Sequence, residues 1–242
     1  MIVQRRALVE HLRHIYCEGQ LGEVVLRGQF ACTAFTVDQQ LMLDTEGLEG
    51  VEPLSAPLGI LDLGLLVKTL KAFGEDDNDD LVIEISDHRI EISEEGRGTI
   101  RLLTGDPDTV PSTMAPTIRE QFLEVLGEGT AVALPQSVVE ALVKTHNLLK
   151  PANIRVRRTK KAGTVFQVGD DGANYADVVL PRAKPRTKAG EYDLILDAQK
   201  LMAVLGQLSD FTASQITFTG EESLVGIWDG AINYILSPQA EG

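Results

Sequence analysis

The chain has 242 residues, of which 36 are acidic and 22 are basic, so its formal net charge is −14 at neutral pH. Such a charge argues against an ordinary nucleic-acid-binding domain, which is basic. With 43% apolar residues over this length, the chain can bury a sizeable core, in one large domain or two of ordinary size, and this composition argues against intrinsic disorder.

Neither a membrane protein nor a secreted protein is indicated. No apolar run approaches the roughly 18 residues that span a bilayer, and Arg and His residues interrupt the apolar residues at the N-terminus. The two cysteines, Cys17 and Cys32, are able to pair in principle, but so low a count is typical of buried thiols in a reducing compartment. We therefore expect a cytoplasmic protein.

Secondary structure is predicted from the period of the apolar residues. Period-2 alternation predicts strands, mostly in antiparallel sheets, at 24–27, 30–37, 81–86, 89–92, 99–103, 154–158, 165–168, 176–180, 215–219, 224–228 and 232–236. Helical periodicity predicts helices at 4–16, 62–73, 136–150 and 198–209.

The middle of the chain has the composition of a connector. Pro107, Pro111 and Pro116 fall in a stretch that lacks sustained periodicity over its first half and separates two halves of similar length. We therefore expect an N-terminal domain at 1–104, an interdomain connector at 105–129 and a C-terminal domain at 130–242.

The sequence contains an internal repeat. The segments 60–70 and 195–205 both contain a strand end, an Asp placed to cap a helix and an amphipathic helix, and both are followed by a loop and three strands. A third copy starts at Leu134, and a fourth, with a shortened first strand, starts at Val3.

Each repeat places an apolar stripe along its helix. With Val3, Leu61, Leu134 and Leu196 as a common origin, the residues five, nine and twelve positions later lie on one helix face. This face packs on a sheet and consists of Leu8, Leu12 and Ile15; Leu66, Leu70 and Phe73; Val139, Val143 and His146; and Leu201, Leu205 and Leu208.

The opposite helix face, three, seven and ten positions after the origin, is small, polar or basic, and Glu10 is its only acid. It consists of Arg6, Glu10 and Arg13; Gly64, Lys68 and Lys71; Ser137, Ala141 and Lys144; and Gln199, Ala203 and Gly206.

Charge is segregated between the helices and the rest of the chain. The four predicted helices carry eight basic and three acidic residues, a net charge of +5, whereas the remainder sums to −19. Two explanations are open: chance together with solvated outer helix faces, or a common basic surface for a polyanion. Screening over about 8 Å at physiological salt lets a local cationic surface act within an acidic protein.

The repeats contain three short motifs, Leu58-Gly59-Ile60-Leu61-Asp62-Leu63, Ile90-Glu91-Ile92 and, at the entry to the connector, Gly105-Asp106-Pro107-Asp108-Thr109-Val110. In these motifs and in its C-terminal run the chain resembles the sliding DNA clamps, the ring-shaped processivity factors of DNA polymerases, and especially the bacteriophage type. The run 232–238 is similar to the last strand and tail of proliferating cell nuclear antigen. The chain departs from the family in its minimal first strand and in its fourth helix, where Lys200 is the only charge.

The resemblance implies an α+β DNA clamp fold with two similar domains, each with two helices packed on antiparallel sheets. Two domains in 242 residues match the clamps that form a ring as a homotrimer rather than the three-domain dimers. In such a ring the edge strand near 99–103 pairs with the edge strand near 175–180 of a neighbouring subunit. This pairing protects both edges and closes the ring head to tail.

The resemblance also implies the function. We expect a non-enzymatic sliding clamp that needs no cofactor, encircles double-stranded DNA without reading its sequence and tethers the replicative DNA polymerase. A clamp loader would place it on DNA, in the host cytoplasm if the protein is viral. Widely spaced Lys and Arg residues that touch phosphates weakly suit a protein that slides. The predicted DNA-binding residues are Arg5, Arg6, Arg13, Lys68, Lys71, Lys144, Lys150 and Lys200.

A second predicted site is a docking groove for partner proteins, because clamps take short peptides with apolar anchors beneath the connector and beside the C-terminal tail. The resemblance points to Ile118, Phe122, Leu123, Tyr234, Leu236 and Pro238. The alternative for these residues is ordinary strand-end packing and a short connector helix.

A histidine pair, an acidic run and two basic segments give weaker indications of function. His11 and His14 have helical spacing but no third ligand nearby, so we expect surface histidines rather than a metal site. The acidic run 75–80 lacks the Gly and Glu of a calcium loop and is predicted to be a solvated loop. The basic segments 155–161 and 182–188 either extend the DNA contact or bind an acidic surface of this chain or a neighbour.

The main competing function is a clamp-fold polymerase accessory or scaffold protein that does not encircle DNA. An enzyme is disfavoured because the sequence has no phosphate-binding glycine loop, nucleophile elbow or zinc-protease motif.

Overall fold

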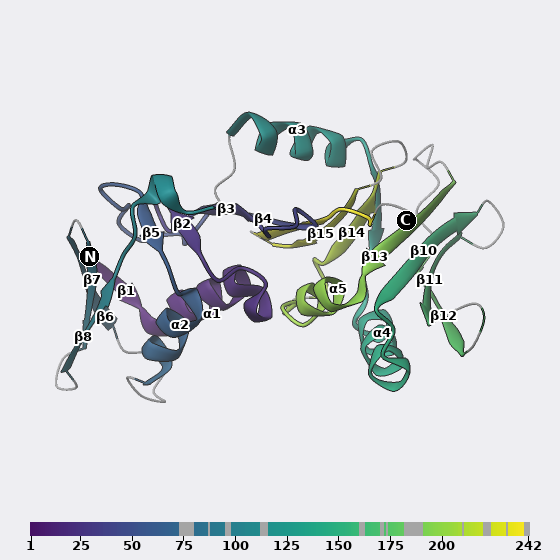
Figure 1. Ribbon diagram of the computed structural model, residues 1–242, viewed down its shortest axis with the longest axis horizontal. Helices are drawn as coiled ribbons and strands as arrows, with labels where there is room; N and C mark the ends of the chain where they lie inside the picture. The colour runs from purple at the N-terminus through teal and green to yellow at the C-terminus, as the bar shows by residue number, and fades with distance from the viewer. Residues whose placement is uncertain are drawn as a thin grey trace. The chain divides into compact units, whose positions relative to one another are not determined.

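The computed structural model describes residues 1–72, 80–86, 88–94, 98–111, 116–159, 163–169, 172, 174–181, 191–209, 211–219, 224–230 and 232–239. The chain divides into two compact units (Figure 1): unit 1 is Met1–Val37 with Leu43–Met114, and unit 2 is Asp38–Met42 with Ala115–Gly242. The contacts thus assign most of the connector to unit 2, whereas the domain limits drawn from the sequence stay a prediction. No helix among these residues is long and apolar enough to cross a membrane.

Unit 1 contains two helices and most of the first eight strands. Its first half comprises β1 (Ile2–Gln4), α1 (Arg5–Tyr16), the 3-10 turn η1 (Cys17–Gly19), β2 (Val24–Leu26), β3 (Cys32–Phe35) and β4 (Leu41–Thr45), whose first residues belong to unit 2. Its second half comprises β5 (Leu58–Ile60), α2 (Leu63–Ala72), β6 (Asp80–Ser86), β7 (Arg89–Glu94), β8 (Gly98–Leu103) and the 3-10 turn η2 (Pro107–Thr109).

A four-stranded antiparallel sheet in the order β1-β6-β7-β8 forms one side of unit 1, and β2 pairs with β5. The helices α1 and α2 pack against each other, and Gly64 allows this close approach. A Cβ atom at Gly64 would lie only 2.9 Å from the Tyr16 hydroxyl oxygen. The absence of a side chain at Gly64 thus leaves room for the Tyr16 ring against α2.

Unit 2 repeats this organisation after the connector helix α3 (Pro116–Gly127). Its elements are β9 (Thr130–Ala133), α4 (Gln136–Leu149), β10 (Asn153–Thr159), β11 (Gly163–Gly169), β12 (Tyr175–Val179), β13 (Tyr192–Asp197), α5 (Ala198–Leu205), β14 (Gln215–Phe218), β15 (Val225–Asp229) and β16 (Ile232–Leu236).

Two antiparallel sheets enclose the core of unit 2. One has the order β12-β11-β10-β13, and the other contains β9, β14, β15 and β16 as successive neighbours. Aromatic rings join the two sheets: Phe218 of β14 stacks on Tyr192 at 5.0 Å between ring centroids and lies 6.4 Å from Phe166. The alternating residues between them, such as Ile154, are fully buried.

The fourfold repeat predicted from the sequence is confirmed. In the described chain each of α1, α2, α4 and α5 begins two residues after its predicted origin, follows a strand and is followed by three strands. Asp62 and Asp197 cap their helices as expected, because their Oδ1 atoms accept hydrogen bonds from the backbone N–H groups of Leu65 at 2.7 Å and Lys200 at 2.9 Å.

The apolar stripe on these helices is also confirmed. Nine of its members are buried, Val143 and His146 are half-buried, and Phe73 lies outside the described residues.

The sequence missed β4 and β9. All five residues of β4 are buried, so no alternation of apolar and polar residues marks it, and β9 is only four residues long.

Two of the motifs that carry the resemblance meet in unit 1. The Gly105 N–H donates a hydrogen bond to the Gly59 carbonyl oxygen at 2.9 Å, which joins the start of the connector to β5. A Cβ atom at Gly59 would lie 2.6 Å from the Gly105 carbonyl oxygen, closer than van der Waals contact allows. The backbone approach therefore requires glycine at position 59.

We predict that Gly59→Ala lowers the free energy of unfolding by about 1–3 kcal/mol, because backbone atoms must move to make room. The matched control is Gly127→Ala, since a Cβ atom there meets nothing within 4 Å. Chemical denaturation of both variants measures the difference. Equal stability of the two variants would show that the Gly59–Gly105 approach is not a tight constraint.

Candidate nucleic-acid interface and partner surface

The outward faces of α1 and α2 are basic. Because Leu8, Leu12, Leu66 and Leu70 are buried, the opposite faces of these helices are turned to solvent. Exposed cations on these faces are Arg6 and Arg13 of α1 and Lys68 and Lys71 of α2. Unit 1 thus presents four cations and one acid, Glu10, on one pair of adjacent helices.

The helices of unit 2 present a weaker version of this surface. Lys144 of α4 is exposed, and Lys150 follows the helix as its left-handed C-cap with its side chain also exposed. On α5 the corresponding face contains exposed Gln199 and Gly206 and buried Ala203, so it bears no exposed cation. The departure of the fourth helix, expected from the sequence, is confirmed.

The ion pairs on these faces are exposed. Arg6 Nε lies 3.1 Å from Glu10 Oε1 with both side chains more than half exposed, and Lys144 Nζ lies 3.9 Å from Glu140 Oε2. Pairs of this kind contribute little to stability. Among the described residues, Arg13, Lys68, Lys71 and Lys150 form no ion pair, so their charges are available to an anion.

Arg5, predicted to bind DNA, is buried instead. Its side chain is 4% exposed, and its Nη1 atom lies 3.4 Å from Glu94 Oε2 at the end of β7. A guanidinium at this depth does not reach a phosphate on the surface, so the prediction for Arg5 is wrong. The pair joins the start of α1 to the four-stranded sheet of unit 1.

Lys200, the single charge of α5, was also predicted to bind DNA, but the structure places it in internal contacts. Its side chain is 10% exposed, and its Nζ atom donates to Asp38 Oδ2 at 2.6 Å and to Gln40 Oε1 at 3.2 Å. The Asp197 carboxylate lies 3.8 Å away. The residue therefore fastens the segment Asp38–Met42 to α5 within unit 2.

The remaining basic set, Arg6, Arg13, Lys68, Lys71, Lys144 and Lys150, has the chemistry for phosphate contact without base readout. Long flexible side chains on helix faces are able to follow a phosphate backbone, and phosphate contacts carry no sequence information. Arg13 and Lys71 also lie in the last turns of their helices, where cations are favoured by the helix dipole.

The connector helix α3 carries the exposed part of the predicted partner surface. Ile118 is 43% exposed, and Phe122 and Leu123 are half-buried. Leu126, at the end of this helix, packs over Gly226 of β15, where a Cβ atom would lie 2.9 Å from Leu126 Cδ2. One face of α3 is thus seated on a sheet while Ile118 remains accessible.

Unlike Ile118 on α3, the C-terminal residues of the predicted partner surface are buried or half-buried. Tyr234 is fully buried and Leu236 is 1% exposed, so these two residues are core, as the strand-packing alternative proposed, and not docking anchors. Pro238 is half-buried. The tail beside it is ordered against the sheets, since the Ser237 N–H donates to the Gln40 carbonyl and the Gln239 N–H donates to the Ile195 carbonyl.

Two arginines of the basic segment 155–161 form contacts within unit 2. Arg155 forms a two-bond pair with Asp193, both bonds 2.6 Å long, and Arg157 donates to the Gln167 side chain. Lys160 and Lys161, like the whole of 182–188, lie outside the described residues. The question of what these two segments bind therefore stays open.

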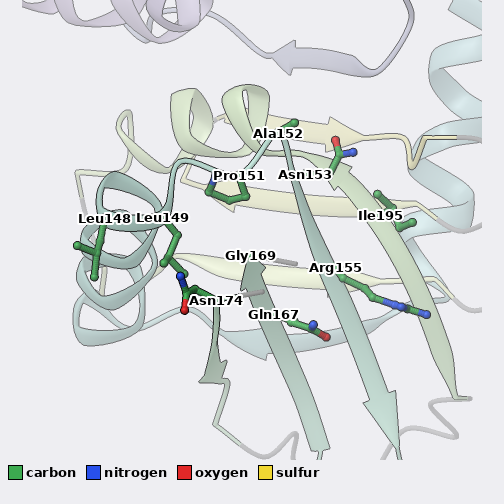
Figure 2. Close-up of a pocket in the computed structure, with 10 residues that line it drawn as sticks. All are labelled: Leu148, Leu149, Pro151, Ala152, Asn153, Arg155, Gln167, Gly169, Asn174 and Ile195. Carbon is green, nitrogen blue, oxygen red and sulfur yellow. The ribbon is translucent and has the colours of Figure 1, made fainter. Parts of the chain in front are cut away.

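A cavity of about 580 Å³ in unit 2 was not anticipated from the sequence. Figure 2 shows Leu148 and Leu149 at the end of α4, Pro151 and Ala152 in the following turn, Asn153 and Arg155 on the strand β10, and Gln167 on β11. The lining combines apolar side chains with the amides of Asn153, Gln167 and Asn174, and the guanidinium of Arg155 in it is engaged by Asp193. Its residues come from separate segments that share no motif.

His11 is buried rather than on the surface, contrary to expectation. Its Nε2–H donates to the Phe30 carbonyl oxygen at 2.9 Å, and burial lowers the pKa of its imidazole below the usual 6.5. Burial also raises the pKa of Cys17 and of Cys32 to about 12, and both thiols are free. No cluster of three metal-ligating side chains exists among the residues that the structure describes.

Sliding clamps are among the solved structures that share this fold. The chain aligns over 100% of its length with 98% of the PCNA chain from A. fulgidus, solved with the C-terminal region of FEN-1, at a TM-score of 0.69 and 14% identity. PCNA from Thermococcus kodakaraensis gives a TM-score of 0.69 at 14% identity, with 99% of both chains covered. The DNA polymerase sliding clamp of Pseudomonas aeruginosa gives 0.69 at 15% identity, with 100% of this chain and 66% of that chain covered.

The chain therefore has the sliding-clamp fold, as the sequence predicted. It spans nearly the full length of the two PCNA chains and about two thirds of the Pseudomonas clamp. No protein-family model and no curated protein sequence matches it. The bacteriophage type stays a prediction.

We predict that Glu94→Gln lowers the free energy of unfolding by about 3 kcal/mol, because it removes the carboxylate that faces the buried Arg5 guanidinium. The control is Glu10→Gln, which breaks an exposed pair and is expected to change stability by less than about 1 kcal/mol. Urea denaturation of both variants gives the comparison. Similar losses for the two would contradict a structural role for Arg5.

Proposed function

We propose that this chain is the subunit of a sliding clamp that closes head to tail into a homotrimeric ring around duplex DNA. The ring tethers the replicative DNA polymerase and confers processivity, and a clamp loader places it on DNA. The observation that carries this proposal is the combination of a two-unit clamp fold with exposed cations on the outward faces of α1, α2 and α4, in a chain of net charge −14.

The charge distribution supports a single DNA-binding surface. Six exposed cations lie on or next to these helices, whereas the chain as a whole is acidic. Three copies would carry −42, so DNA is repelled from most of the assembly and attracted only where the helix faces gather. In the proposed ring these faces line the hole.

The partner surface is proposed to lie on α3, with Ile118 as its exposed anchor and Phe122, Leu123 and Pro238 around it. The PCNA of A. fulgidus was solved bound to the C-terminal region of FEN-1, a segment of another protein. Apolar anchors of this kind fit the way in which short peptides bind partner proteins.

Trimer formation separates the proposed ring from the alternative, a clamp-fold accessory or scaffold protein that does not encircle DNA. We predict that light scattering after size exclusion at micromolar concentration gives a mass near three times 26.3 kDa. A monomer under these conditions would contradict the closed ring and favour the accessory protein.

We predict that Arg13→Glu combined with Lys144→Glu weakens binding to duplex DNA at moderate salt and reduces polymerase stimulation, while the oligomeric mass is unchanged. Each lost phosphate contact also lowers the slope of log K against log salt by about one unit. The control is Arg27→Glu with Arg89→Glu, which makes the same change of charge at exposed positions outside the helices. If the control loses as much affinity, the helix faces are not the DNA surface.

A further inference from the structure

Lys200 of α5 lies at the centre of a polar cluster in unit 2. Its side chain is only 10% exposed, and its Nζ atom donates hydrogen bonds to Asp38 Oδ2 at 2.6 Å and to Gln40 Oε1 at 3.2 Å. The Asp197 Oδ2 atom lies 3.8 Å from the same nitrogen. One ammonium group thus lies between two carboxylates and an amide, where charge-assisted hydrogen bonds are strong.

The turn that Lys200 contacts has a defined shape. Gln39, at its centre, has a left-handed φ of 57°, and the Gln40 N–H donates to Asp38 Oδ1 at 3.2 Å. The two carboxylate oxygens of Asp38 therefore have separate roles, because Oδ1 closes the turn and Oδ2 accepts from Lys200.

This turn has no apolar anchor of its own. Val37, which precedes it, is 91% exposed, and Asp38 and Gln39 are exposed as well. Apolar burial therefore does not hold these three residues in place. The attachment of the turn to α5 is polar, and Lys200 makes it.

The C-terminal tail is joined to the same turn. The Ser237 N–H donates to the Gln40 carbonyl oxygen at 3.0 Å. The Gln239 N–H donates at 2.8 Å to the carbonyl oxygen of Ile195, a residue of β13 that Figure 2 labels. Pro238, between these two attachments, has no N–H of its own. Gln40 thus contacts α5 through its side chain and the tail through its backbone.

We propose that Lys200 is a positioning residue for the C-terminal part of the partner surface. Its ammonium group holds the turn 38–40 against α5, and this turn holds the tail, so that Pro238 is presented in one conformation. Lys200 is nearly buried and acts through the tail rather than by contact with a partner. This inference rests on the proposed partner surface, which includes Pro238. A surface that is ordered before binding avoids part of the entropy cost of association.

The charge of Lys200 matters as well as its hydrogen bonds. Both the Asp38 and the Asp197 carboxylates approach the same nitrogen within 3.8 Å, so without the ammonium group they face each other with no cation between them. Like charges at a poorly solvated site repel each other. Removal of the charge therefore drives the turn away from α5 and takes the acceptor away from the Ser237 N–H.

The first test measures amide hydrogen exchange by NMR in the full chain. We predict that Lys200→Met, which keeps a long side chain without its charge, speeds exchange of the Ser237 amide at least about tenfold. The amide of Ile227, in the interior strand β15, reports larger openings and changes much less. Arg27→Met, which removes one cation at an exposed site of unit 1, is the matched control and leaves Ser237 exchange unchanged.

A double variant separates charge from packing. Asp38→Asn in the Lys200→Met background removes the unpaired carboxylate, while the Asn side chain is still able to close the turn. We predict that the double variant recovers at least about half of the lost protection of the Ser237 amide on a logarithmic scale, because the two substitutions are coupled. A role limited to the packing of the Lys200 side chain gives no recovery.

The link to the partner surface is measured by polymerase stimulation. The probe is the replicative DNA polymerase of the same source on a primed single-stranded template. We predict that Lys200→Met raises the clamp concentration for half-maximal stimulation at least about fivefold, because the tail must be ordered during binding. Maximal stimulation and oligomeric mass are unchanged, since the cations on the outward helix faces are untouched.

The outcomes distinguish this inference from the proposed function. Unchanged exchange at Ser237 in Lys200→Met, equal acceleration at Ile227, or no recovery in the double variant overturns the role of Lys200 and leaves the clamp function standing. Faster exchange at Ser237 with an unchanged half-maximal concentration also overturns it, because the tail is then not part of the partner surface. A wild-type chain that does not stimulate the polymerase overturns the proposed function, and the exchange rates then decide whether Lys200 positions the tail.

Discussion

The burial of one apolar stripe per helix is the constraint from which the rest of the molecule follows. Residues such as Leu8, Leu12 and Ile15 have no accessible surface to speak of, and this fixes the rotation of α1 about its axis. Once the rotation is fixed, Arg6 and Arg13 lie on the exposed face of the helix. The same geometry turns Lys68 and Lys71 outward on α2, so packing of the core sets the position of the charges.

This arrangement separates the exposed cations on the helices from the acidic remainder of the chain. A net charge of −14 on a protein with exposed cations gathered along helices creates a surface at which an anion is attracted and a remainder from which it is repelled. Contacts made by a few mobile Lys and Arg side chains are weak and exchange readily. Both properties suit a protein that holds DNA by enclosing it rather than by gripping it.

The repeat made most of the fold predictable. Apolar spacing gave the four helix starts, because a stripe at i, i+4 and i+7 has one rotational solution, and the Asp62 and Asp197 caps marked two of these starts directly. β4 escaped prediction because a strand buried on both faces loses its alternation. Its assignment depends on neighbours that are distant in sequence.

The site was less predictable than the fold, for the same reason. The sequence shows that Arg5 and Lys200 are charged and near helix starts, but only the fold brings Glu94 and Asp38 to them across long sequence separations. Likewise, Tyr234 was predicted on the partner surface but lies in the core, and His11 was predicted on the surface but is buried against the Phe30 carbonyl. Local pattern identifies which faces are exposed, whereas tertiary contacts decide which charges remain free.

The central claim, that the protein encloses DNA, is tested most directly by topology. Subunits are assembled in the presence of a closed circular plasmid, and the complex is then washed in 1 M salt, where the screening length is about 3 Å and electrostatic contacts are lost. The account predicts that protein stays with the circular plasmid and is released when a restriction enzyme linearises it. Equal loss from circular and linear DNA in the wash would contradict enclosure.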